Sequence, residues 1–232
     1  QEIGQFYGWV YEGIARTQDE LDGHATQQGA NVGDCLYKDI SGPNGEPDGV
    51  IDAYDQTVLG SGLPKVNFGL STHMEYKGFD LNISTYGVLN YHVSDDIYNS
   101  LNSCYGYGNK EVGMLDANRW SEDGSTYLSS VPRTYAANNA TLAWNDLFSS
   151  RKIQNAAYWK IANVELGYNF PDKWFGGYVS GVRLYVSAQN LYTFTGYHGY
   201  NVDYAGGTFT PGYNFCSFPS ARTFMCGLHF TF

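Results

Sequence analysis

The sequence has few charged residues and no long apolar run. Charged side chains make up 16% of its 232 residues, and 23 acidic residues against 13 basic ones give a net charge of −10. Proteins that neutralise nucleic-acid phosphates need clustered Lys and Arg, so this balance argues against a nucleic-acid partner. No segment approaches the ~18 apolar residues of a membrane-crossing helix. The sequence is still compatible with membrane-crossing strands, because such a strand needs only about 10 residues and half of them face inward.

Cysteine is also scarce, with Cys35, Cys104, Cys216 and Cys226 as the only four. They show no CxxC spacing and have no histidine at metal-ligand distance, so they match no metal or redox motif. Export permits disulfides without requiring them, which leaves open the pairs 35–104 and 216–226. No secretory signal is visible, so we expect that an exported protein would have its N-terminus upstream of Gln1.

Aromatic residues and glycine are abundant instead. Aromatics make up 17% of the chain, with 21 Tyr, and Gly occurs 28 times. Pleated strands and turns use these residues, whereas helices favour Ala, Leu, Glu and Lys. We therefore predict an all-β fold. Period-two alternation of apolar and polar residues predicts about six antiparallel strands, at 4–14, 65–76, 79–89, 158–170, 182–190 and 221–232. The strand at 158–170 has a regular second half and a bulge in its first half.

The strand predicted at 221–232 shows the alternation most clearly. Phe224, Cys226, Leu228 and Phe230 lie on one face, and polar residues such as His229 lie on the other. Alternation alone does not separate a membrane barrel from a soluble half-buried sheet, because each has one apolar face and one polar face.

The lengths of the connections favour a membrane barrel. The turn at 77–78 and the stretch 171–180 are short, whereas 17–63, 90–154 and 196–220 are long. Outer-membrane barrels combine short periplasmic turns with long extracellular loops. A compact soluble domain rarely carries several long loops at one end. We predict that the three long segments are extracellular.

The aromatic residues and the chain end agree with this prediction. Aromatics gather beside the short turns, as in the interfacial girdles of membrane proteins: Tyr76, Phe79, Phe170, Trp174, Phe175, Phe230 and Phe232. The terminus resembles the C-terminal signal by which the barrel-assembly machinery recognises its clients, which places the C-terminus in the periplasm. Six strands would leave two unpaired edges in lipid. We therefore expect the whole chain, 1–232, to be the C-terminal segment of a larger barrel, without the plug domain and the earlier strands.

The chain contains an ordered series of aromatic- and glycine-rich motifs: FYGWVYEGI (6–14), GDCLYKD (33–39), DGVID (48–52), YKGFDL (76–81), NRW (118–120), VPR (131–133), ANVELGY (162–168), VRLYVSAQNLYTFTGY (182–197) and RTFMCGL (222–228). In this order, these segments resemble elements of the SusC-like TonB-dependent outer-membrane transporters. The resemblance implies a 22-stranded transmembrane barrel plugged by an N-terminal domain. It also implies TonB as the energy source, acting through the absent N-terminal region, and a SusD-like surface lipoprotein that closes over the substrate.

The sharpest local motif is the acidic segment NGEPDGVIDAYD (44–55). With Asn44 as position 1, oxygen donors fall at 1, 3, 5, 9 and 12 and Gly at 6, which is the spacing of a calcium loop. The predicted Ca²⁺ ligands are Asn44, Glu46, Asp48, the Val50 carbonyl, Asp52 and Asp55. Pro47 is unusual in such a loop, and Asp39 is an alternative first ligand. The alternative interpretation is an acidic loop stabilised by bonds from side chains to the backbone.

Aromatic residues in the predicted loops offer surfaces on which sugar rings stack, and acidic and amide groups nearby offer partners for sugar hydroxyls. The first candidates for substrate binding are Trp120 and Tyr98, with Asp95, Asp96 and Asn99. The alternative is that these side chains pack the loops together or contact the SusD-like partner.

We predict a transporter and no enzyme. The five histidines are scattered without an HExxH motif or a nearby nucleophile, and nothing places two carboxylates around a cleft as glycoside hydrolysis requires. The leading hypothesis is import of oligosaccharides across the bacterial outer membrane, together with a SusD-like lipoprotein. Two alternatives stay open: the same architecture importing peptides, and a soluble, calcium-dependent glycan-binding β-domain.

Overall fold

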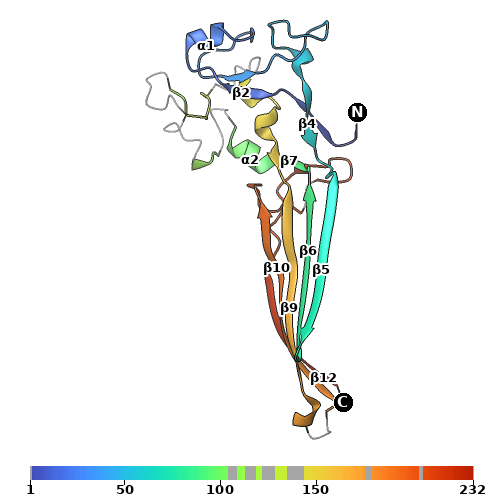
Figure 1. Cartoon of the computed structure of the whole chain (residues 1–232). Helices are drawn as coiled ribbons and strands as arrows, with labels where there is room; N and C mark the ends of the chain where they lie inside the picture. Colours follow the sequence, from blue (N-terminus) through green and yellow to red (C-terminus); the bar gives the residue numbers. More distant parts are fainter. Residues whose placement is uncertain are drawn as a thin grey trace. The chain divides into compact units, whose positions relative to one another are not determined.

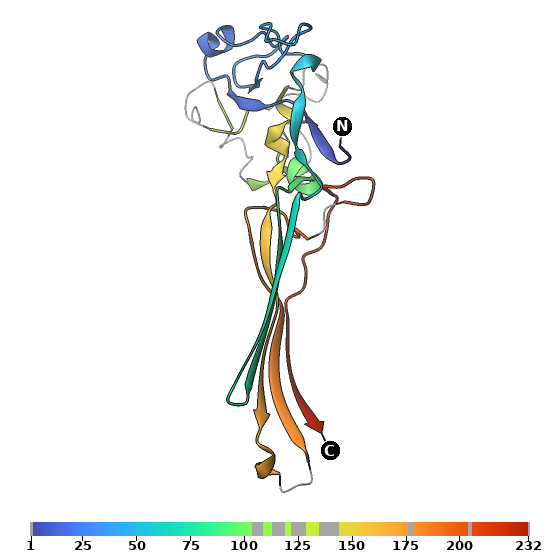
Figure 2. The same cartoon turned by 45° about the vertical axis from the view of Figure 1, so that its right-hand side comes forward.

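The computed structural model describes residues 2–103, 109–112, 119–121, 129–134, 144–175, 179–203 and 206–231. The chain divides into two compact units (Figures 1 and 2). Unit 1 comprises 1–63, 92–154 and 205–216, and unit 2 comprises 64–91, 155–204 and 217–232. Within the described ranges, no helix combines the length and the apolar character that crossing a membrane requires.

Unit 2 is built on a five-stranded antiparallel sheet with the order β12-β10-β9-β6-β5. The strands are β5 (Val66–Tyr76), β6 (Phe79–Leu89), β9 (Tyr158–Phe170), β10 (Gly181–Thr195) and β12 (Thr223–Thr231). They confirm five of the six predicted strands. Their lengths of 9 to 15 residues reach the 9–11 residues that a tilted strand needs to cross a bilayer.

The hairpin between β5 and β6 closes through a two-residue turn at Lys77 and Gly78. Both residues have positive φ, 49° and 88°, which is the signature of a type I′ turn and matches the twist of the flanking strands. The turn fixes the pairing of Tyr76 with Phe79 and hence the register of the whole hairpin.

The first half of β9 contains the predicted bulge. Asn163 pairs with Ser84, but the next pair joins Ile161 to Thr85, so Ala162 has no partner in β6. The pairing of β9 with β10 shifts at the same level, where Asn190 adopts a positive φ of 53°. A bulge bends a strand and increases its local twist, so this end of the sheet differs in direction from the regular part.

Unit 1 consists of short elements and contains most of the segments predicted as long loops. Its strands are β1 (Gln5–Gly8), β2 (Tyr11–Ile14), β3 (Cys35–Tyr37), β4 (Thr57–Ser61), β7 (His92–Asp95) and β11 (Tyr213–Asn214). Its helices are α1 (Gln18–Asp22) and α2 (Asp96–Leu101), with short 3₁₀ turns such as η1 (Ala53–Asp55). β8 (Gln154–Asn155) lies at the boundary between the units, and η7 (Asp172–Trp174) belongs to unit 2.

The single strand predicted at 4–14 is wrong. β1 pairs with β4 and β2 pairs with β3, so the segment breaks between them. At the break, Trp9 N–H donates to the carbonyl of Phe148 instead of to a neighbouring strand. The reason is that aromatic residues occupy both faces of this segment, so that it lacks the single apolar face of a sheet strand.

Aromatic and aliphatic side chains form the core of unit 1. Cys35, Tyr37 and Ile51 are fully buried, and Trp9 and Trp144 pack against them. Cys216 and Cys226 carry free thiols, so the bond between them that the sequence permits is not formed. Cys104 lies outside the described residues, and its pairing with Cys35 stays untested.

Candidate functional site

One face of the five-stranded sheet is apolar and uncovered within unit 2. The register places Phe79, Tyr168, Leu184 and Leu228 in one row across four strands. Phe224, Leu228 and Phe230 expose 68%, 58% and 49% of their surface. In a self-contained soluble sheet this face would be the buried one. The predicted alternation of apolar and polar residues is therefore confirmed, and contact of the apolar face with lipid stays a prediction.

Aromatic rings cluster where the strands approach the short connections. The ring centroids of Phe79 and Tyr168 lie 4.6 Å apart, those of Tyr168 and Phe170 5.0 Å, and those of Phe170 and Trp174 5.8 Å. Trp174, in η7, remains largely exposed. Exposed aromatic rings at one level of a sheet are typical of a membrane–water interface.

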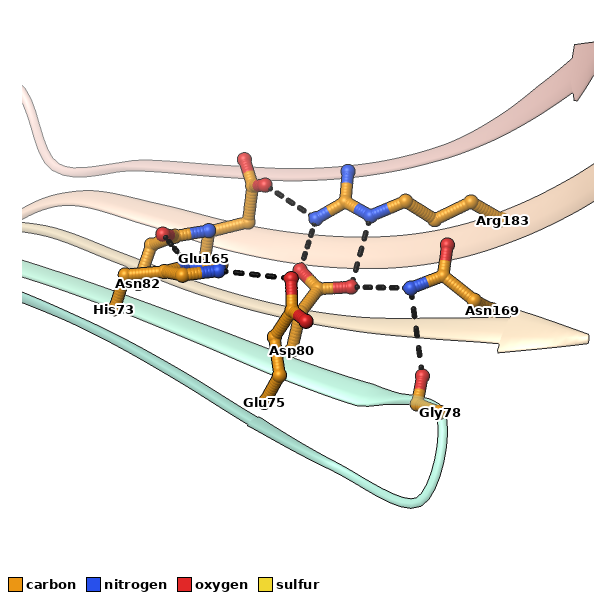
Figure 3. A network of polar contacts seen from close by, with 8 residues as sticks. All are labelled: His73, Glu75, Gly78, Asp80, Asn82, Glu165, Asn169 and Arg183. Atoms are coloured by element: carbon orange, nitrogen blue, oxygen red, sulfur yellow. Dashed lines mark hydrogen bonds and ion pairs between the residues drawn. The ribbon is translucent and has the colours of Figure 1, made fainter.

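The opposite face carries a network of ion pairs (Figure 3). Arg183 on β10 donates to Asp80 on β6 through Nε, at 3.0 Å, and also through Nη2. The same Nη2 donates to Glu165 Oε1 on β9 at 2.7 Å. Asn169 Nδ2 donates to Asp80 Oδ1 at 3.0 Å. One guanidinium thus joins three strands, and the bidentate geometry makes this a strong type of pair.

A glycine between the strands makes the network possible. Asp80 and Tyr185 both pair with Gly167 of β9. A Cβ at Gly167 would lie 2.5 Å from Asp80 Oδ1 and 2.6 Å from Arg183 Nη2, which is closer than heavy atoms approach without a bond. The ion pair therefore occupies the space that a side chain at Gly167 would fill.

His73 and two acceptors extend the polar face along β5 (Figure 3). His73 Nδ1 lies 2.6 Å from Asn82 Oδ1, and Nε2 lies 2.9 Å from Glu75 Oε1. His73 pairs with Asn82 across the hairpin and so lies on the polar face of the sheet. The pairing of Asp80 with Arg183 was missed, because opposite charges on two strands meet only when the register is known.

Sequence reasoning missed a second ion pair, near the bulge in unit 2. Lys160, with only 4% of its side chain exposed, pairs with Asp203. The Lys160 ammonium also lies 5.9 Å from the centroid of the Tyr86 ring. Burial, assisted by the charge of Asp203, raises the pKa of Tyr91 to about 12. These contacts fasten the segment that follows β10 to the end of the sheet.

The acidic and amide residues predicted to bind sugar have structural partners in unit 1. Asp95 is buried at the N-terminus of α2, where its Oδ1 accepts from Tyr98 N–H at 2.9 Å and its Oδ2 from Asn214 Nδ2 at 3.2 Å. Asn99 Nδ2 donates to Ser94 Oγ at 3.1 Å. Asp96 faces solvent and Tyr98 is half-buried. Sugar binding by these residues stays a prediction.

Trp120 does not offer an open ring surface. It is only 9% exposed, and a Cβ at Gly33 would lie 2.4 Å from its ring, so the indole lies directly over Gly33. Beside it, Arg133 forms a bidentate pair with Asp34, which raises the pKa of the guanidinium. The tyrosines at 105, 107, 127, 135 and 204 in the predicted loops lie outside the described residues.

The predicted calcium loop is held by its own backbone. Asp55 is fully buried, and its oxygens accept from the N–H groups of Ile40 at 2.7 Å, Ser41 at 3.1 Å and Asp52 at 2.8 Å. Asp48 Oδ1 accepts from Val50 N–H at 3.0 Å.

Two features of this loop bear on calcium binding in opposite directions. Among the described residues, no three His, Cys, Asp or Glu side chains lie close enough together to hold a metal ion. Buried Asp39 Oδ1 has no hydrogen-bond partner, and an unsatisfied carboxylate oxygen is a group that a hard cation would satisfy. Asn44 and Glu46 are exposed. Calcium binding stays a prediction.

Comparison with known proteins places this geometry in a family. No protein-family model matches the chain. Over its full length it is 31% identical to TonB-dependent receptor P3 and 27% identical to TonB-dependent receptor P26, both of Formosa agariphila. It is 26% identical, over 85% of its length, to TonB-dependent receptor SusC of Bacteroides thetaiotaomicron. The chain belongs to the SusC-like TonB-dependent receptors. It spans about a fifth of the length of the curated relatives it matches.

The fold of this SusC-like chain is also that of solved barrels. The structure of the RagAB peptide transporter matches 97% of the chain, and 22% of its own, with a TM-score of 0.72 at 21% identity. The RagAB peptide importer in the open-open state gives a TM-score of 0.71. The predicted all-β barrel segment is therefore confirmed. The sheet itself is open, with β12 and β5 at its edges.

Proposed function

We propose that this SusC-like chain forms part of the wall of an outer-membrane barrel that imports oligosaccharides by a TonB-dependent mechanism. The observation that carries the proposal is the two-faced sheet. One face is apolar and uncovered, and the other holds the Asp80–Arg183–Glu165 network. Lipid can cover the first face, and a polar lumen suits the second. TonB-dependent receptors of this kind are outer-membrane proteins.

The orientation follows from the short and long connections. We place the C-terminus and the turn at 77–78 in the periplasm, and 17–63, 90–154 and 196–220 outside the cell. The exposed Trp174 in the short 171–180 connection supports a position of this connection at a membrane–water interface, since aromatic rings favour such interfaces. Energy would come from TonB through sequence outside this chain, and a SusD-like lipoprotein would cover the extracellular side.

Oligosaccharides are the imported molecules in this proposal. Oligosaccharides are favoured by the many tyrosines in the extracellular segments, because Tyr offers a rigid apolar ring with a polar tip. Peptides are the second candidate, since the RagAB structures with the same fold are those of a peptide transporter. Uptake of defined oligosaccharides and peptides by cells that carry or lack the gene separates the two.

A soluble calcium-dependent glycan-binding domain is the third candidate. The exposure of Phe224, Leu228 and Phe230 argues against it, because such a face would drive aggregation in water. Fractionation of cells tests the choice. We expect the protein in outer membranes, released only by detergent; recovery of the protein in buffer without detergent would contradict the proposed function.

A further inference from the structure

A pocket of about 310 Å³ lies in unit 2 at the bulged end of the sheet. Its walls are the start of β9, the end of β10 and the segments 197–203 and 219–222. This pocket is large enough for a small ligand, because small-molecule binding sites begin at about 300 Å³. No prediction from the sequence singled it out.

The pocket carries one positive charge in excess. Its charged lining residues are Lys160, Asp203 and Arg222. Buried Lys160 and Asp203 neutralise each other as an ion pair. Among the described residues, no hydrogen bond or ion pair involves the side chain of Arg222. In a chain with a net charge of −10, Arg222 is thus a lining residue whose guanidinium has no ionic partner among the described residues.

The position of Arg222 is fixed by its neighbours. Asn190, in the left-handed conformation at the bulge, donates through Nδ2 to the carbonyl of Ala221 at 2.9 Å. On the other side of Arg222, Thr223 pairs with Gln189 at the start of β12. A guanidinium on a fixed backbone loses less entropy when it binds a ligand than one on a loose segment.

The facing wall of the pocket is also built by internal bonds. Asn201 Nδ2 donates to the carbonyl of Phe218 at 3.0 Å, and Asp203 N–H donates to Asn201 Oδ1 at 3.0 Å. Tyr200, also in the lining, keeps 71% of its surface exposed. The pocket therefore combines an arginine on a fixed backbone with an open aromatic ring.

We propose that this pocket binds a carboxylate group of the imported molecule, with Arg222 as the binding residue. The inference rests on the proposed import function and narrows its substrate to acidic molecules. A guanidinium presents two parallel N–H groups that match a carboxylate. The Tyr200 ring adds a stacking surface for the ring or side chain that bears the carboxylate. A uronic acid of an oligosaccharide and a carboxylate of a peptide share this chemistry.

Binding to the purified full-length transporter in detergent tests the proposal. The probes are tetragalacturonate and its methyl ester, and a tripeptide and its C-terminal amide. We expect the free acid of at least one pair to bind more tightly than its neutral partner. Arg222→Gln should weaken binding of that acid at least about ten-fold and leave the neutral probe unchanged. Arg222→Lys should cause a smaller loss, and the exposed Lys173→Gln should cause none.

The outcomes distinguish a sugar acid from a peptide as the source of the carboxylate, and they distinguish failure of the carboxylate pocket from failure of the import function. Preference for tetragalacturonate supports a sugar acid, and preference for the free peptide supports a peptide carboxylate. Equal binding of acid and neutral probe in both pairs overturns the carboxylate pocket, as does an Arg222→Gln protein that retains the preference. If Arg222→Gln does not fold, the acid preference of the unaltered protein and its loss in high salt decide instead. Outer-membrane fractionation tests the import function independently.

Discussion

Among single residues, Gly167 has a structural role that its missing side chain explains. The Asp80–Arg183 ion pair crosses β9 in the space where a Cβ would lie. Gly69 lies on the same polar face, and a Cβ added there would make only an ordinary van der Waals contact, 3.6 Å from the carbonyl oxygen of Thr85. The two glycines therefore differ in what a methyl group would displace.

Gly167→Ala should destabilise the barrel by about 1–3 kcal/mol, because the methyl group would force the ion pair apart. Unfolding in urea, followed in detergent by the heat-dependent shift of the folded band on gels, measures the change. Gly69→Ala is the matched control and should stay within about 0.5 kcal/mol of the parent. Equal effects at both positions would show that Gly167 does not make room for the pair.

Tyr91 provides a pH test outside the strands. Its pKa is raised to about 12 by burial and by the nearby Asp203. A group whose pKa is higher in the folded state adds stability below its unfolded pKa, near 10, and loses it as pH rises through the folded value. The thermal midpoint should therefore fall between about pH 10 and pH 12, and less steeply in Tyr91→Phe. Parallel curves for both proteins would contradict this assignment.

Among the elements, the hairpin turn at 77–78 sets the register of β5 against β6. Gly78 has a φ of 88°, and an added Cβ would lie 3.0 Å from the carbonyl oxygen of Asn169. Gly78→Ala should cost about 1–2 kcal/mol in the same unfolding assay. Lys77→Asn should be tolerated, since Asn adopts positive φ readily. Loss of stability in Lys77→Asn but not in Gly78→Ala would rule out this turn geometry.

The acidic loop at 44–55 gives a prediction for calcium. If the loop binds the ion, calcium should raise the thermal midpoint of the protein, and Asp48→Ala should abolish that gain. Asp96→Ala changes an exposed carboxylate elsewhere in unit 1 and should keep the response. A midpoint that does not respond to calcium, or a response that persists in Asp48→Ala, would leave the loop as a motif held only by its backbone bonds.

How far the sequence predicts each element depends on how local the signal is. The long strands of unit 2 alternate regularly, so period two located β5, β6, β9, β10 and β12 and their apolar faces. The segment 4–14 carries aromatic residues on both faces, and alternation did not show its division into β1 and β2.

The candidate sites were harder to predict than the strands. The Asp80–Arg183 and Lys160–Asp203 pairs join residues 103 and 43 positions apart, so they depend on register and on where a loop folds back. Trp120 was a candidate for stacking on sugar, with packing between the loops as the alternative, and its burial follows from packing over Gly33, a long-range contact that composition does not encode.

In the whole molecule, the open sheet implies partners for both of its edges. β5 and β12 each have one unpaired side, and unpaired backbone groups in lipid cost several kcal/mol each. The chain covers about a fifth of the length of its relatives, and under the proposed function the strands beside β5 and β12 belong to the rest of such a barrel. The apolar face then forms one continuous arc of a larger wall.

The central claim is that this apolar face contacts lipid while the other face borders the lumen. It is tested most directly by spin labels at single cysteines along β12 of the protein in bilayers. Labels at Phe224, Cys226 and Leu228 should collide with oxygen dissolved in lipid, whereas labels at Met225 and His229 should be shielded from it. The predicted result is an accessibility that alternates with every residue. Equal accessibility on both faces, or shielding of the label at Leu228, would contradict the account.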